Sequence, residues 1–100
     1  MRKIIRQGDI ILREINEGEI STPALKEVTE VELSGETGNK HVIRPLSGRI
    51  MHDRLANVIV VTEEAEIVHP EHRRLTIPKG RWLIDRVRQW LGNRNGNAMD

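Results

Sequence analysis

Apolar residues in this chain come in short runs, and most runs alternate with polar residues. Alternation with a period of two is typical of β-strands that bury one face, and several of the runs end near glycine or proline, which favour turns. The run at 58–61 contains only valine and isoleucine and is the best candidate for a central strand. The expected strands cover residues 9–15, 27–33, 41–44, 49–52, 56–62, 65–69 and 75–77.

Three features interrupt this pattern. The alternation within 27–33 changes phase near Thr29 and Glu30, which predicts a β-bulge. Pro78, Lys79 and Gly80 have the composition of a tight turn and predict a hairpin after the strand at 75–77. Pro45 is expected to end the strand at 41–44.

Residues 81–91 fit two kinds of element. Leu83, Val87 and Leu91 recur every four residues, as on one face of an amphipathic helix. Trp82 and Ile84 instead alternate with polar neighbours, as in a strand. Periodicity alone slightly favours the helix, whereas a turn at residues 78–80 favours a strand that begins at residue 81.

The composition favours a small all-β protein. One hundred residues form a single domain, and without Phe or Tyr the aromatic part of its core must come from Trp82 and Trp90. The predicted fold is a single-domain barrel or sandwich of six to eight short strands over residues 1–92, with a flexible tail at 93–100. The absence of cysteine excludes disulfides and thiol catalysis and is consistent with a cytoplasmic protein.

The net charge of +1 conceals an acidic segment at 14–36 and a basic segment at 73–94. A basic stripe could bind nucleic acid through its phosphates, or the two segments could neutralise each other within the fold or between subunits. Trp82 and Trp90 are better explained as core residues than as stacking platforms for bases. The candidate nucleic-acid-binding residues are Arg73, Arg74, Arg81, Arg86 and Arg88.

Histidines supply the other candidate chemistry. His69 and His72 flank Pro70 and Glu71, and His41 follows the glycine-rich turn at 35–38. We expect these segments to lie close together at one end of the barrel, where the histidines either shape the turns, take part in acid–base chemistry, or bind a divalent transition metal. The candidate metal ligands are His41, His69, His72 and Glu71.

Five blocks in order resemble a family of small uncharacterised bacterial and phage proteins. The blocks are QGDIIL at 7–12, GETGNKH at 35–41, HPEH at 69–72, LTIPKGRW at 75–82 and RVRQ at 86–89. The resemblance implies an all-β layout with a strand from residue 81 to about residue 89, and no activity. This chain has Asn39 where the family has the first histidine of an HxH element, and the likeness to cupins is only loose.

No complete catalytic set is visible, so an enzyme is the less favoured reading. We expect a small cytoplasmic binding or accessory module that forms a homo-oligomer or binds a larger protein partner. The alternatives are a cupin-like metal-binding protein or enzyme and a nucleic-acid-associated module. The apolar run after the charged N-terminus is too short for a signal peptide or membrane span, so no membrane association is expected.

Overall fold

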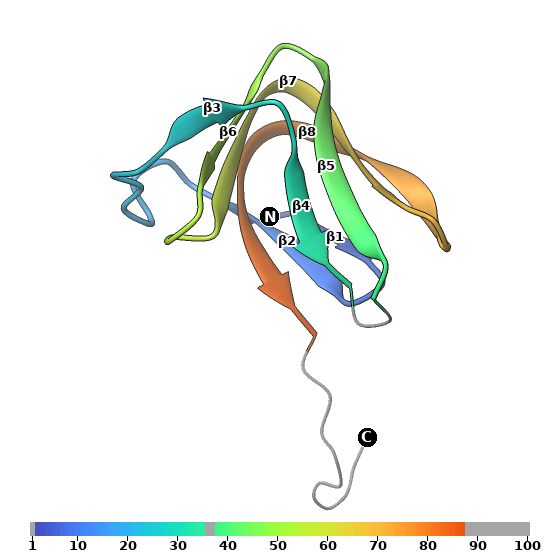
Figure 1. The fold of residues 1–100 in the computed structure, drawn as a ribbon. Helices are drawn as coiled ribbons and strands as arrows, with labels where there is room; N and C mark the ends of the chain where they lie inside the picture. Colours follow the sequence, from blue (N-terminus) through green and yellow to red (C-terminus); the bar gives the residue numbers. More distant parts are fainter. Residues whose placement is uncertain (1, 36–37, 88–100) are drawn as a thin grey trace, which may run out of the picture.

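The computed structural model describes residues 2–35 and 38–87, which form eight β-strands and contain no helix (Figure 1). The predicted all-β class and the number of strands are therefore confirmed. It follows that no helix in the described part of the chain could cross a membrane. The strands are β1 (Ile4–Gln7), β2 (Ile10–Ile15), β3 (Lys26–Val28), β4 (Val31–Ser34), β5 (Lys40–Ser47), β6 (Ile50–Asp53), β7 (Val58–His69) and β8 (His72–Arg86).

The two longest strands, β7 and β8, organise the fold, because the two halves of each strand pair with different neighbouring strands. β7 pairs with β6 through residues 58–61 and with β5 through residues 64–68. β8 pairs with β2 through residues 81–86 and with β7 along most of its length. The antiparallel sheet in the order β1-β2-β8-β7-β5-β4 curls into a half-barrel, and β3 joins it through β6 (Figure 1).

The predicted hairpin turn at Pro78, Lys79 and Gly80 is wrong, because β8 runs through these residues without a break. The pairing with β7 shifts register there, and Gly80 has a φ of 149°, which glycine adopts more readily than other residues. Pro78 and Gly80 therefore lie opposite a β-bulge in β7, where Thr62 and Glu63 face the single residue Lys79. The strand predicted from residue 81 is confirmed as far as Arg86, while residues 88 and 89 lie outside the described residues.

Other predicted boundaries were also wrong. The segment 27–33 is two strands with different partners, because β3 pairs with β6 and β4 pairs with β5, so Thr29 and Glu30 carry the chain between them. The strands predicted at 56–62 and 65–69 are the two halves of β7. Pro45 does not end β5, which continues to Ser47 across a further register shift.

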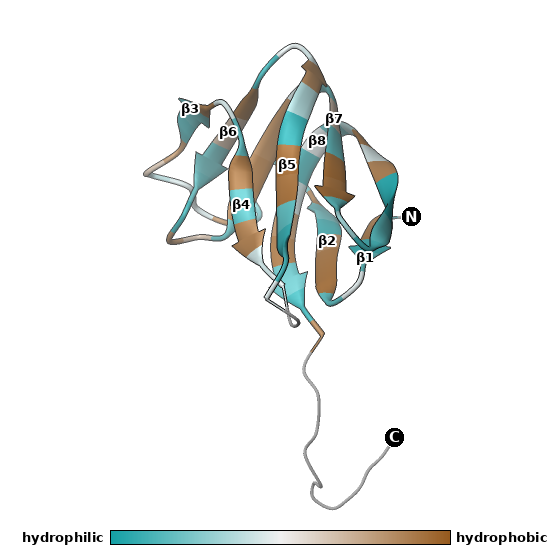
Figure 2. Ribbon diagram, turned by 45° about the vertical axis from the view of Figure 1, so that its right-hand side comes forward, coloured by the Kyte–Doolittle hydropathy of each residue, from teal (hydrophilic) through white to brown (hydrophobic). Residues whose placement is uncertain are grey.

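An aliphatic core with Trp82 as its largest side chain fills the curled sheet. The alternation of apolar and polar residues is visible along β4 in Figure 2. Trp82 is completely buried, as predicted, and its Nε1–H donates a hydrogen bond of 3.1 Å to Pro78 O. Trp90 and the tail predicted at 93–100 lie outside the described residues. Other fully buried core residues are Ile10, Leu12, Ile43, Ile50, Val58, Ile59, Ala65 and Ile77.

Candidate histidine site

Three histidines meet at one end of the half-barrel, beside the turn between β1 and β2. The ring centroids of His41 and His69 are 4.4 Å apart, those of His69 and His72 are 4.5 Å apart, and those of His41 and His72 are 6.1 Å apart. Val42 of β5 pairs with Val68 of β7 in an antiparallel register, so His41 and His69 are opposite one another. Both side chains therefore lie on the same face of the sheet, opposite to the face of Val42 and Val68. The prediction that these segments converge is confirmed for the histidines.

The glycine-rich turn also reaches this cluster. A Cβ atom placed on Gly35 would lie 3.4 Å from Nε2 of His69, so the described start of the turn lies close to the histidines as predicted. Residues 36 and 37 lie outside the described residues.

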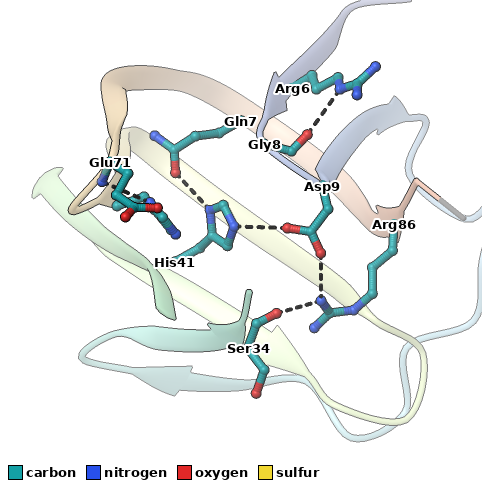
Figure 3. Close-up of polar contacts among 9 residues, drawn as sticks. Arg6, Gln7, Gly8, Asp9, Ser34, His41, Glu71 and Arg86 are labelled. Atoms are coloured by element: carbon teal, nitrogen blue, oxygen red, sulfur yellow. Dashed lines mark hydrogen bonds and ion pairs between the residues drawn. The ribbon is translucent and has the colours of Figure 1, made fainter. Parts of the chain in front are cut away.

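Gln7 at the end of β1 joins three parts of the chain. Its Nε2 donates hydrogen bonds to Ile67 O at 3.0 Å and Arg73 O at 2.7 Å, next to a register shift in the β7–β8 pairing. This arrangement directs Oε1 of Gln7 toward Nδ1 of His41 at 2.9 Å (Figure 3). Because a carbonyl oxygen only accepts, Nδ1 of His41 carries a proton.

The second ring nitrogen of His41 faces a charged pair. Nε2 of His41 lies 3.2 Å from Oδ1 of Asp9, and an NH1 group of Arg86 lies 3.4 Å from Oδ2 of the same carboxylate. Arg86 also donates to the backbone carbonyl of Ser34 at 2.5 Å. This network connects the β1–β2 turn with β5, β8 and the end of β4 (Figure 3).

Burial and the contact between Asp9 and His41 shift the pKa values of these two residues in opposite directions. Burial alone would raise the pKa of Asp9, but the hydrogen bond with His41, the Asp9 backbone and the charge on Arg86 together hold that pKa below its usual range. Burial lowers the pKa of His41, and the hydrogen bond to Asp9 offsets this only in part. A bond from Nε2 to the Asp9 carboxylate requires protonated His41, which burial disfavours.

We expect the fold to lose stability as the pH falls below about 6.5. The pKa of His41 is lowered in the folded state, so the unfolded chain binds a proton at this residue more readily. Acid therefore stabilises the unfolded state relative to the folded state. The lowered pKa of Asp9 adds a further loss below its ordinary value of 3.8. Urea unfolding followed by circular dichroism across this range measures the effect.

His52 makes a second contribution to the acid sensitivity, and separate variants distinguish it from that of His41. Burial and then the charge of Arg54 also lower its pKa, although it lies on β6, away from the network. His52→Gln should remove one part of the acid sensitivity, and His41→Gln should remove another. An unfolding free energy that stays constant between about pH 7 and pH 5 would contradict the lowered pKa of both histidines.

His69 and His72 are less tightly bonded than His41. Nδ1 of His69 accepts the backbone N–H of Glu71 at 3.0 Å, and none of the hydrogen bonds among the described residues involves the ring of His72. Gly8 has a φ of +59°, and a Cβ atom there would lie 2.7 Å from Nε2 of His72. The β1–β2 turn therefore needs glycine both for its backbone conformation and for the approach of this ring.

The hydrogen bonds fit a braced cluster better than a metal centre. Both ring nitrogens of His41 contact protein groups, and Glu71 supplies its backbone N–H. Because Nδ1 of His69 is an acceptor, the neutral ring carries its proton on Nε2, the atom that a metal would need. Within residues 2–35 and 38–87, no group of three or more His, Asp or Glu side chains could hold a metal ion. Metal binding stays a prediction.

The candidate basic stripe is divided among three acidic partners. Arg86 contacts Asp9, Nε of Arg74 lies 3.4 Å from Glu66, and Arg81 lies 4.0 Å from Glu17. The last contact joins the acidic and basic segments of the sequence within the fold. Arg73 offers its backbone carbonyl to Gln7, and Arg88 lies outside the described residues.

Sequence reasoning overlooked Gln7 and Asp9 as site residues and named them only within the QGDIIL block at 7–12. Gln7 is 3% exposed at the inward end of β1, and an amide at an inward position of a strand is the signal that could have identified it. Arg86, a candidate nucleic-acid-binding residue, has its side chain directed to Asp9 and Ser34, and its role in binding nucleic acid stays a prediction.

Together, the curled sheet and the braced histidines define a small β half-barrel domain with a polar site at one end. The chain belongs to the DUF8820 family, a domain of unknown function whose match covers residues 6–87. That range includes the whole network from Gln7 to Arg86. No curated protein and no solved structure matches the chain.

Proposed function

We propose that this domain is a small binding or accessory module without catalytic activity of its own, and that its ligand binds at the histidine end. The burial of His41 carries the proposal. His41 is the residue best equipped for acid–base chemistry, yet it is 1% exposed and both its ring nitrogens contact protein groups. A general base must come within hydrogen-bond distance of a substrate proton, and His41 is enclosed instead.

The neighbouring residues are more suitable for binding. His72 is exposed at the start of β8, and its ring lies beside that of the mostly buried His69. The network of Gln7 and Asp9 holds His41 behind this pair, so the two rings rest on a rigid support. Binding sites held by braced side chains and regular strands retain their geometry without a ligand.

A fragment screen followed by ¹H–¹⁵N spectra of the full chain tests this proposal. We expect binding fragments to shift the amide signals of Gly8, Gly35 and residues 69–72, with no turnover of any fragment. His72→Ala should weaken these shifts, whereas His52→Ala on β6 should leave them unchanged. Binding confined to other surfaces, or binding in which His72→Ala has no effect, would contradict the proposed site.

A metal-binding protein is the alternative supported by the proximity of the three imidazoles, whose centroids lie within 6.1 Å of one another. Elemental analysis of the purified protein separates the two readings. We expect metal far below one ion per chain. Near-stoichiometric metal that disappears in the His69→Ala, His72→Ala double variant would establish the alternative and replace the present proposal.

Open strand edges support a protein partner or a second copy of the chain. In the described sheet β1 and β4 end the strand path, and each has one neighbouring strand. Unpaired edges can accept a further strand from another chain. Light scattering over a range of protein concentrations measures whether the cytoplasmic module that we propose forms a homo-oligomer.

A further inference from the structure

The ring of His69 contains a buried hydrogen-bond donor with no acceptor in the described part of the chain. Its Nδ1 accepts the backbone N–H of Glu71, so the proton of the neutral ring is on Nε2. His69 is 8% exposed, and no hydrogen bond from Nε2 occurs among residues 2–35 and 38–87. Since buried polar groups nearly always have partners, Nε2–H requires an acceptor from outside this part of the chain.

Gly8 and Gly35, which have no side chain, lie beside Nε2 of His72 and Nε2 of His69 respectively. A Cβ atom on Gly35 would lie 3.4 Å from Nε2 of His69, and one on Gly8 would lie 2.7 Å from Nε2 of His72. The ring centroids of His69 and His72 are 4.5 Å apart and the ring planes are inclined by 45°, so the two imidazoles are close neighbours. A side chain at Gly8 would clash with the ring of His72, and one at Gly35 would clash with the carbonyl oxygen of Asn39.

The charged groups around the pair decide which acceptor is suitable. The carboxylate of Asp9 contacts His41 and Arg86, so its charge is compensated within the network. Glu71 lies two residues after His69 in the β7–β8 turn, where its backbone N–H donates to Nδ1 of His69, and its negative charge would oppose an anion at this end. Imidazole N–H groups bind charged oxygens more strongly than neutral ones.

We propose that the histidine end binds the oxyanion group of its ligand, a carboxylate or a phosphate, through Nε2–H of His69 with His72 beside it. This inference rests on the proposed function and names the chemical class of its ligand. The chemistry is shared by carboxylates and phosphates, so the test uses one probe of each kind.

Titration of the full chain with acetate and with inorganic phosphate, at constant ionic strength set by chloride, tests this inference. Long-range ¹H–¹⁵N spectra of the histidine rings report the tautomer of His69 directly. We expect a proton on Nε2 of His69 and a saturable shift of this signal with at least one probe. A response to acetate alone assigns a carboxylate, and a response to phosphate alone assigns a phosphate group.

Three variants make the result specific. His69→Gln should weaken binding at least about tenfold, because a hydrogen bond to a charged group is lost. Glu71→Gln should strengthen binding severalfold by removing the opposing charge, and His52→Gln on β6 should have no effect. Circular dichroism confirms that each variant is folded, and the Glu71→Gln result remains decisive if His69→Gln unfolds.

Acetamide separates failure of this inference from failure of the proposed function. Equal binding of acetamide and acetate, or fragments at the histidine end without any anion response, would overturn the oxyanion assignment and leave the binding module intact. No binding of any probe or fragment at this end would overturn both proposals.

Discussion

Replacement of Trp82 by alanine is expected to remove about 3–5 kcal/mol from the free energy of unfolding. Trp82 has no exposed surface and is the largest side chain of the core. Its removal also leaves the carbonyl of Pro78 without the indole donor. Because small domains have a total stability of about 5–15 kcal/mol, much of the margin is lost. Urea unfolding monitored by far-ultraviolet circular dichroism gives the difference.

Trp82→Phe separates the effect of volume from that of the hydrogen bond. Phenylalanine keeps most of the aromatic volume and lacks the N–H, so its cost should be clearly smaller than that of alanine. Leu55→Ala serves as the surface control, because Leu55 is 92% exposed. A loss for Trp82→Ala no larger than that for Leu55→Ala would show that Trp82 does not support the core.

Gln7→Glu is expected to destabilise the protein by about 2–5 kcal/mol at neutral pH. The change replaces an NH₂ group that donates to Ile67 O and Arg73 O with a carboxylate oxygen that only accepts. The buried carbonyl of Ile67 and the partly buried bond at Arg73 O then lose their donor, and both oxygens face a negative charge. Chemical unfolding at neutral pH measures this loss.

Gln7→Ala provides the comparison, because it removes the same hydrogen bonds without adding a charge. We expect it to be less destabilising than Gln7→Glu, although the two variants lose the same donor. Equal stability of Gln7→Glu and the original protein would mean that the amide of Gln7 has the opposite orientation. The proton assigned to Nδ1 of His41 would then be wrong as well.

The all-β class could be predicted because hydrophobic alternation is local. Each strand that buries one face has to repeat apolar residues with a period of two, as in β4, whatever its neighbours are. The extent of the strands was less accessible. Pro78 and Gly80 have the same composition in a turn and in a strand opposite a bulge, and only the pairing with β7 on both sides of the register shift decides between these structures.

The candidate site was likewise predictable only in part from the sequence. The sequence identified His41, His69 and His72 and the expectation that they converge. It did not identify Gln7 as their support, because Gln7 bonds to residues 34 to 66 positions away in the chain. Such contacts depend on the register of several strand pairs.

The sequence by itself determined a small all-β domain with an aliphatic core, Trp82 inside it and a cluster of histidines at one end. The tertiary structure alone decided what these polar groups do: His41 is enclosed between Gln7 and Asp9, Arg86 pairs with Asp9, and His69 retains a donor without an acceptor in the described part of the chain. The physical reason is range. Burial of one strand face follows from neighbouring residues, whereas a hydrogen bond needs two atoms within about 3 Å, which distant segments achieve only after folding.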